Sequence, residues 1–335
     1  FSQGRRINDE GVAQFSGRPG SDFDKRLNRF GERTAQICQL WRAAFGTQAD
    51  RVRCVMAGQA ANSYVAETAL NCPLSTLAPC RAKGIVGLAI APYIGDHIGL
   101  PDFEATVAGW TADADGGLNR LFNEMNTGTE LKYEGLSGMP IVRTRISAHA
   151  KLAAEQNVAL LAYEGGQHLT GVGAPANNTA INTLMDAANR DSRMGTLYAG
   201  YLQDWSNAGG GLFMHFSDVG IYSRFGRWGA LELVTQTTSP KYDALQVFAQ
   251  TAAEGTANCV FAWVERSFPT LFTPAATSTQ RLKPFYFRSY GSGAAATFLA
   301  TNWPEQRLMA LGPATGGQVF DAGHVNDFAV GASCP

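Results

Sequence analysis

Charged residues are scarce in this chain of 335 residues. Asp, Glu, Lys and Arg together make up 16% of it, whereas ordinary soluble domains have about a quarter. Neither sign dominates, since 27 Lys and Arg stand against 28 Asp and Glu. This balance argues against a surface that attracts nucleic acid or an anionic membrane. We therefore expect an uncharged partner and no nucleic acid.

Several familiar patterns are also missing. No apolar run reaches the roughly 18 residues that a membrane-spanning helix needs, so we predict no membrane span. No CxxC, HxH or HxxxH spacing occurs, which disfavours a metal site, and we expect no cofactor. The sequence also lacks Gly-x-Ser-x-Gly, which argues against a protease or esterase of the serine type.

Cysteine is present in an even number, with six residues in the chain. Together with low charge and many small polar residues, this favours three disulfides in an oxidising compartment, and we predict a secreted, extracellular or cell-surface protein. Buried free thiols in a cytosolic protein are the alternative. Other connectivities stay open, but the expected pairs are Cys72 with Cys80, Cys38 with Cys54, and Cys259 with Cys334.

Helical patterns and apolar runs alternate along the first 254 residues. A long amphipathic helix is expected from Leu27 to Phe45, with Gly46 as its stop signal. Strands are expected over residues 51–58, 84–93, 158–164 and 211–217, and helices over residues 139–157, 179–207 and 240–253. This order is typical of an α/β enzyme built from βα repeats. After residue 255, short runs separated by Gly, Pro, Ser and Asn predict a small antiparallel β-sandwich.

The most informative sequence is Tyr163-Glu164-Gly165-Gly166, where a buried strand breaks into a glycine loop. Loops at the carboxyl ends of parallel strands often carry catalytic residues, so Glu164 is the leading catalytic candidate. A glutamate that only hydrogen-bonds the following turn is the alternative. Polar and aromatic residues also follow the other strands. They are Gln59, Asn62 and Tyr64, then Tyr93 and His97, then Gln167 and His168, then His215 and Asp218.

These residue types suit a sugar ring. Neutral side chains pair with its hydroxyl groups, and aromatic rings pack on its C–H face. Trp228 is a further stacking candidate, although ordinary packing beneath a loop would explain it equally well. Tyr93, His168 and His215 taken singly could each be structural.

Four segments carry a resemblance to a known family. They are Ala57-Gly-Gln-Ala-Ala-Asn62, Ile90-Ala-Pro-Tyr93, Ala162-Tyr-Glu-Gly-Gly-Gln-His168 and Phe213-Met-His-Phe-Ser-Asp218. In this order they resemble the second half, strands five to eight, of a clan-A-type (β/α)8 glycoside hydrolase, and they are similar to secreted bacterial proteins described as cellulose-binding or glycosidase-like. The resemblance implies a TIM-barrel portion over residues 1–254, with the β-sandwich over residues 255–335.

The resemblance also implies roles for the site residues. Glu164 would be the nucleophile of a retaining hydrolase and Tyr93 would orient it. Gln59, Asn62, His168 and His215 would bind sugar hydroxyls, and Tyr64 or Trp228 would stack on a ring. His97, Gln167 and Asp218 complete the expected substrate site.

A retaining hydrolase needs a second carboxyl group about 5 Å from the first. Asn8-Asp9-Glu10 is the nearest acidic candidate, but no apolar strand precedes it, and we assign it to a surface loop. By resemblance, the acid/base glutamate would lie on an N-terminal half of the barrel. The expected partners are therefore carbohydrate and either that half, cut from the same precursor, or a second copy of the chain. The alternative function is a non-catalytic, glycan-binding or self-assembling surface protein on a degenerate hydrolase barrel.

Overall fold

The computed structural model describes residues 9–133 and 137–254, together with four short strands further along the chain. The chain divides into two compact units, residues 1–245 and 246–335. The domain boundary expected after residue 254 stays a prediction.

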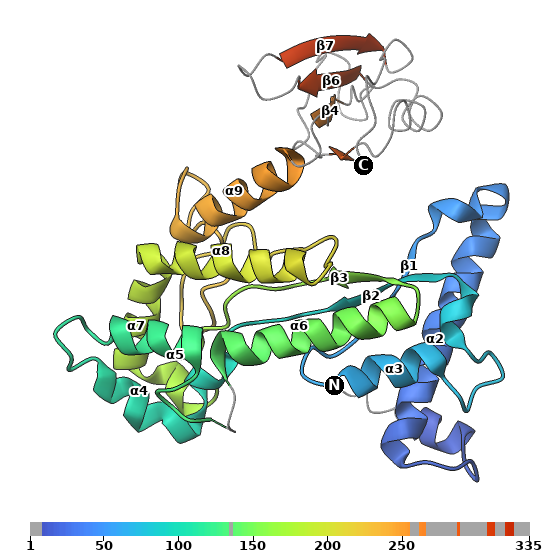
Figure 1. Ribbon diagram of the computed structural model, residues 1–335, viewed down its shortest axis with the longest axis horizontal. Coiled ribbons are helices and arrows are strands. Elements are labelled where there is room, and N and C mark those ends of the chain that lie inside the picture. Colours follow the sequence, from blue (N-terminus) through green and yellow to red (C-terminus); the bar gives the residue numbers. More distant parts are fainter. Residues whose placement is uncertain are drawn as a thin grey trace, which may run out of the picture. The chain divides into compact units, whose positions relative to one another are not determined.

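The first unit consists of helices around a small sheet (Figure 1). Asp9 and Glu10 are exposed, as expected, but residues 9–14 are helical, so their assignment to a loop was wrong. The longer α-helices are α2 (Asp22–Phe45), α3 (Ser63–Asn71), α4 (Glu104–Trp110), α5 (Leu118–Thr127), α6 (Gly138–Glu155), α7 (Thr179–Arg190), α8 (Ser192–Asn207) and α9 (Pro240–Glu254), which continues into the second unit. Short 3-10 segments are η1 (Gly46–Arg51), η2 (Cys80–Lys83), η3 (Asp96–Gly99), η4 (Pro101–Phe103) and η5 (Ala174–Asn177).

The sheet of the first unit has three parallel strands in the order β1 (Cys54–Ala57), β2 (Ile85–Ile90) and β3 (Ala159–Ala162). Successive side chains of a strand point to opposite faces. The face that carries Leu88, Ile90 and Leu160 is buried in the hydrophobic core. On the opposite face of the sheet, Val55 is 38% exposed and Ala159 is exposed. The helices therefore cover one face of this sheet more completely than the other.

The predicted half-barrel is wrong, because the fourth expected strand does not form. Of residues 211–217, only Phe213 makes a bridge, to Ala162 of β3. Leu212 is 63% exposed and Met214 is 48% exposed, so this apolar run lacks the covering layer that stabilises a buried strand. The expected helix over residues 179–207 is two helices, since the side chain of Asp191 accepts a hydrogen bond from Arg193 N–H and begins α8.

The predicted β-sandwich is also wrong. In the described part of the second unit, one antiparallel sheet is present, with the order β5 (Phe287–Arg288), β4 (Phe261–Glu265), β6 (Arg307–Leu311) and β7 (Val319–His324). A sandwich requires two sheets that pack face to face, and no second sheet occurs among these residues. The expected Cys259–Cys334 pair lies outside the described residues.

The long N-terminal helix α2 has the predicted stop. Ser21 and Asp24 form a reciprocal capping box at its start, which satisfies amide groups that the first turn leaves unpaired. Its last residue is Phe45, and Gly46 follows with a positive φ of 51°. Ile37 and Trp41, two of the apolar residues whose helical spacing predicts this helix, are 46% and 58% exposed. The helix instead buries its neighbouring face.

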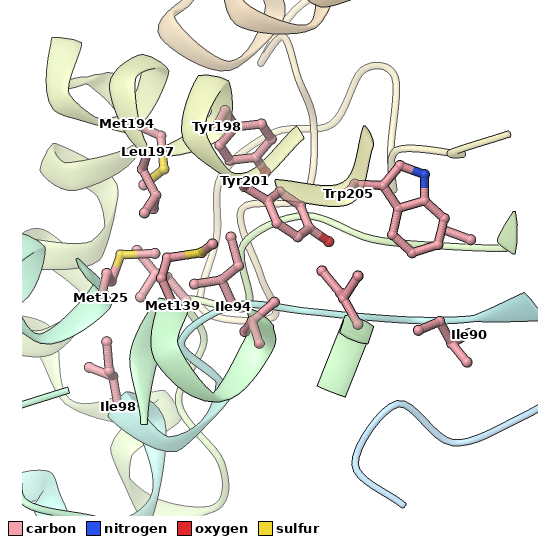
Figure 2. Packing of buried hydrophobic residues seen from close by; sticks show 14 of the residues in the cluster. Ile90, Ile94, Ile98, Met125, Met139, Met194, Leu197, Tyr198, Tyr201 and Trp205 are labelled. Atoms are coloured by element: carbon pink, nitrogen blue, oxygen red, sulfur yellow. The ribbon is translucent and has the colours of Figure 1, made fainter. Parts of the chain in front are cut away.

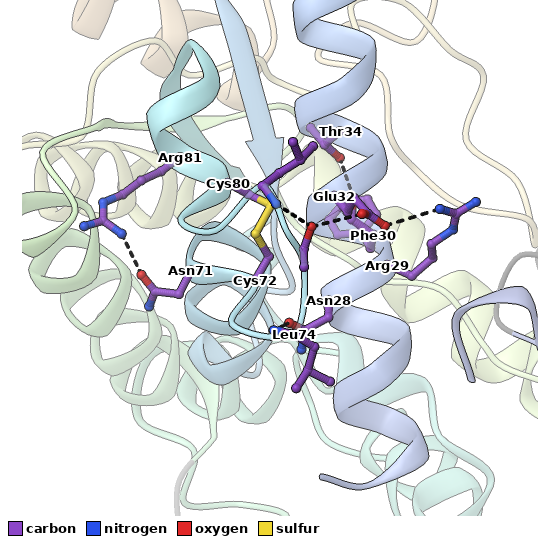
Figure 3. The surroundings of a disulfide bond; sticks show 12 residues. Asn28, Arg29, Phe30, Glu32, Thr34, Asn71, Cys72, Leu74, Cys80 and Arg81 are labelled. Carbon is purple, nitrogen blue, oxygen red and sulfur yellow. Dashed lines mark hydrogen bonds and ion pairs between the residues drawn. A yellow bond between two sulfur atoms is a disulfide. The ribbon is translucent and has the colours of Figure 1, made fainter. Parts of the chain in front are cut away.

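Two predicted disulfides are confirmed. Cys38 of α2 is joined to Cys54 of β1, and Cys72 is joined to Cys80. Figure 3 shows the second bridge beside a polar contact network of α2, in which Glu32 accepts hydrogen bonds from Ser75 at 3.0 Å and from Arg29 at 3.3 Å. Disulfides persist in oxidising compartments, so these bridges are compatible with a secreted protein.

The core joins α8 to the sheet and to the loop after β2. Tyr198, Tyr201 and Trp205 of α8 are each at most 1% exposed. Figure 2 shows them gathered near Ile90 and Ile94. The Tyr201 hydroxyl donates to the backbone carbonyl of Pro92 at 2.6 Å, which satisfies a buried polar group. This contact fixes the loop that carries Tyr93.

Among the helices that the structure describes, none is both long enough and apolar enough to cross a lipid bilayer.

Candidate functional site

The candidate site begins where β2 and β3 end. The loops after these strands are tied by backbone hydrogen bonds, from Ile94 N–H to the Gly166 carbonyl at 3.0 Å and from His168 N–H to the Ile94 carbonyl at 2.7 Å. The parallel register continues through an isolated bridge between Ile94 and Gln167. Tyr93 and Glu164 are thereby held on adjacent loops at the same edge of the sheet.

Tyr93 donates a hydrogen bond from its hydroxyl to Oε2 of Glu164 at 2.6 Å. Burial raises the pKa of Tyr93 well above its ordinary value, and the hydrogen bond and the negative charge of Glu164 raise it further. The hydroxyl therefore stays protonated and remains a donor at neutral pH. A single donor fixes one carboxylate oxygen of a half-buried Glu164.

Aromatic rings pack around this pair. The ring of Tyr93 lies 5.5 Å from His168 and 5.8 Å from Trp228, in edge-to-face arrangements. Trp228 also contacts His168 at 4.8 Å and Phe216 at 5.9 Å. Burial lowers the pKa of His168, so at neutral pH this imidazole is uncharged. The site thus combines one carboxylate with neutral aromatic surfaces, and we call these five residues the Glu164 cluster.

His215 lies beside the cluster and is held from both ring nitrogens. Nε2 is 3.1 Å from the Tyr198 hydroxyl, and Nδ1 is 3.1 Å from the backbone carbonyl of Ser217. Burial, and secondarily the positive charge of Lys241, lower the pKa of His215 to about 4. This imidazole is therefore neutral at physiological pH and supports the loop that bears Phe216.

Gln167 is buried, with 1% of its surface exposed, and its amide is occupied at both ends. Nε2 donates to the Arg227 carbonyl at 2.7 Å, and Oε1 accepts from Leu169 N–H at 2.6 Å. The contact to Arg227 links the Glu164 loop to the segment with Trp228. With both ends of its amide hydrogen-bonded, the Gln167 side chain supports the loop that carries Glu164.

The remaining expected residues have contacts of their own. Asn62 caps α3 by accepting from Tyr64 N–H at 3.2 Å, and the Tyr64 hydroxyl donates to Asp24. His97 is buried against Glu124. Gln59 and Asp218 are exposed. No contact found among the described residues joins these five side chains to the Glu164 cluster, and their role in binding sugar stays a prediction.

Several residues that shape the site were missed in the sequence analysis. Phe216 follows His215 directly and is 42% exposed, so the strand-end pattern that selected His215 could have included it. Arg227 and Lys241 are fully buried, and Lys241 donates to the backbone carbonyl of Arg227, the residue before Trp228. A buried Arg or Lys is rare, and the local sequence carries no sign of that burial.

The two glycines after Glu164 allow close packing. A β-carbon on Gly165 would lie 2.4 Å from Cζ of Phe213 and 3.0 Å from the Tyr201 hydroxyl. Gly166 has a φ of +139°, and a β-carbon there would lie 2.8 Å from the Tyr198 hydroxyl. The Gly-Gly pair is therefore needed where the loop passes over α8.

We expect Gly165→Ala to destabilise the protein by about 2 kcal/mol or more, because the added methyl group overlaps a well-packed ring. Gly200→Ala is the matched control, since Gly200 lies on α8 and a β-carbon there meets no atom within 4 Å. Urea unfolding of both variants checks this prediction. Equal midpoints for the two variants would contradict the close packing at Gly165.

No cluster of three or more His, Cys, Asp or Glu side chains arranged to hold a metal ion occurs in the part of the chain that the structure describes. No protein-family model, curated protein or solved structure matches the chain.

Proposed function

We propose that this protein is a secreted or cell-surface protein that binds carbohydrate at the Glu164 cluster and hydrolyses a glycosidic bond, with Glu164 as nucleophile. The observation that carries the proposal is the Tyr93–Glu164 hydrogen bond within a group of aromatic rings. A carboxylate beside aromatic surfaces offers both the attacking group and the apolar contact that a sugar ring needs.

The proposed hydrolysis uses Glu164 and Tyr93 together. The Glu164 oxygen that attacks the anomeric carbon would form a glycosyl ester, which water then hydrolyses. Tyr93 keeps its proton, as the raised pKa requires, and its hydrogen bond holds the carboxylate in one orientation. Such positioning lowers the entropic cost of reaching the transition state.

A second carboxyl group must protonate the leaving oxygen. We expect it on a further polypeptide, either an N-terminal partner from the same precursor or a second copy of this chain. The exposed apolar residues near the site, such as Leu212 and Met214, are compatible with such a partner.

The test compares the natively purified wild-type protein, with any associated polypeptide retained, with an equally prepared Glu164→Gln protein on soluble glucan, xylan and mannan. We expect Glu164→Gln to lower the release of reducing ends by about 10³-fold or more, while polysaccharide affinity changes by no more than about twofold, because the amide keeps the shape but cannot attack. The control is Glu155→Gln, which alters an exposed residue of α6.

The outcomes separate the two functions under consideration. Turnover that survives in Glu164→Gln would overturn the nucleophile. If the wild-type protein and the variant both bind polysaccharide without turnover, a glycan-binding scaffold is favoured. The aromatic contacts around Trp228 favour this second function independently. Absence of both would overturn the carbohydrate proposal.

A further inference from the structure

A tight turn next to the Glu164 cluster displays an exposed phenylalanine. Ser223 and Gly226 exchange two backbone hydrogen bonds, of 3.1 Å and 2.9 Å, and Phe225 N–H donates to the Ser223 hydroxyl at 3.2 Å. Gly226 has a φ of +137°, a conformation that side-chain-bearing residues rarely adopt. The turn is thus closed by its own hydrogen bonds, yet the Phe225 side chain is 74% exposed.

Arg224 holds this ring in place. Its guanidinium lies over the Phe225 ring, with Cζ 4.7 Å from the ring centroid, and Nη1 donates to the side chain of Asn177. The Arg224 carbonyl accepts from the Thr170 hydroxyl at 3.2 Å. One side of the ring is therefore supported by a cation–π contact, which leaves the exposed part available to a ligand.

The turn is joined to the site through Trp228. The indole N–H of Trp228 donates to the Phe225 carbonyl at 3.2 Å, and the same indole ring contacts Tyr93, which holds Glu164. Phe216 contacts the indole as well. Phe225 thus belongs to the same hydrogen-bonded and packed unit as the carboxylate.

Exposure of one large apolar side chain is common on a protein surface. Here the backbone turn is closed by hydrogen bonds and Arg224 contacts one side of the exposed ring, so little conformational ordering is needed when a ligand binds. Preorganised aromatic groups contribute to affinity because little conformational entropy is lost on binding. An adjacent aromatic surface beside a sugar site points to a ligand longer than one or two sugar units.

We propose that Phe225 is a second sugar-binding position, so that the ligand of the Glu164 cluster is an oligosaccharide or polysaccharide chain that extends over the 223–226 turn. This inference rests on the proposed function. The apolar C–H face of a distal sugar unit packs on the exposed part of the Phe225 ring, while the unit at Glu164 contacts Trp228.

Isothermal titration with β-1,4-linked gluco-, xylo- and manno-oligosaccharides, from disaccharide to hexasaccharide, tests the proposal on the full chain. We expect Phe225→Ala to weaken hexasaccharide binding about tenfold, the size of one aromatic contact, with the disaccharide affinity unchanged. Phe225→Tyr keeps an aromatic face and should restore hexasaccharide binding. Ile221→Ala is the control, because Ile221 is 73% exposed in the same segment.

Three results would overturn the second sugar-binding position at Phe225. Equal hexasaccharide affinity in the wild-type chain and Phe225→Ala would overturn the second position and leave the proposed function intact. Equal weakening of disaccharide and hexasaccharide would also overturn it, since Phe225 would then act on the cluster as a whole. If the wild-type chain binds none of the three series, both the second position and the proposed carbohydrate site are overturned.

Discussion

Glu124→Gln is expected to lower the free energy of unfolding by about 3 kcal/mol. Glu124 is fully buried on α5, and its carboxylate accepts from four groups. His97 Nε2 lies 2.5 Å away and the Ser137 hydroxyl 2.9 Å away, while the backbone N–H groups of Glu130 and Leu131 donate at 2.7 and 3.0 Å. A glutamine has the same shape, but it places an N–H₂ group where an acceptor is needed.

The pH dependence of this effect follows from the carboxyl group. Burial alone would raise the pKa of Glu124, but the hydrogen bonds from His97, Leu131 and Ser137 outweigh it and lower the pKa below its ordinary value. A lowered carboxyl pKa stabilises the fold above the unfolded pKa, and this contribution is lost as the pH falls through the folded value. The difference in free energy of unfolding between the wild-type protein and Glu124→Gln should therefore become smaller at acidic pH.

Urea unfolding at neutral pH and at about pH 4 measures both parts of this prediction. Glu67→Gln on α3 is the control, because Glu67 is exposed. A Glu124→Gln protein as stable as the Glu67→Gln protein at neutral pH would show that the carboxylate network contributes nothing net to the fold.

The sequence predicted those parts of the fold that depend on local pattern. The runs that became β2 and β3 are apolar and buried, and Gly46 ends α2 as expected. The barrel failed because an apolar run such as Leu212–Met214 forms a strand only when neighbours and a covering layer are present, and no local pattern reports them. The break between α7 and α8 was missed because Asp191 can cap a helix or lie within one.

For the site, the sequence brought together Tyr93 and Glu164, and the structure joins them by a hydrogen bond. Both side chains follow adjacent strands, so strand order alone places them close together. His97 follows a strand as well, but its partner Glu124 lies 27 residues further along the chain. Such long-range partners decide whether a polar residue faces a ligand or the core, and they cannot be read from spacing.

The free energy of unfolding of the wild-type protein is expected to rise with pH above neutrality. Lys241→Met is expected to remove most of this rise. Lys241 is 0% exposed, and Nζ donates to the Arg227 carbonyl at 2.6 Å and to Asn189 Oδ1 at 2.9 Å. The ammonium also lies over the Tyr222 ring, 4.6 Å from its centroid. Within the described residues no carboxylate makes an ion pair with Lys241, so its charge is poorly compensated.

Burial is the main cause that lowers the pKa of Lys241 from 10.5 to about 7; the negative charge of Glu232 opposes this shift, and the positive charge of Arg227 adds to it. Between these two values the unfolded chain binds more protons than the folded one. The free energy of unfolding therefore rises with pH, by up to about 1.4 kcal/mol per pH unit for this group. The methionine variant has no ammonium to bury, so it lacks this contribution.

Urea unfolding of both proteins from about pH 7 to about pH 9 measures how steeply the free energy of unfolding of each rises with pH. This pH range lies below the one in which the buried tyrosines begin to titrate. Lys151→Met is the control, because the Lys151 side chain is 79% exposed on α6 and its loss should leave the wild-type slope unchanged. Equal slopes in Lys241→Met and wild type would mean that the amine keeps its ordinary pKa in the folded protein. A flatter slope in Lys241→Met alone would establish that a proton leaves Lys241 near neutral pH, next to the Arg227 carbonyl that its Nζ contacts.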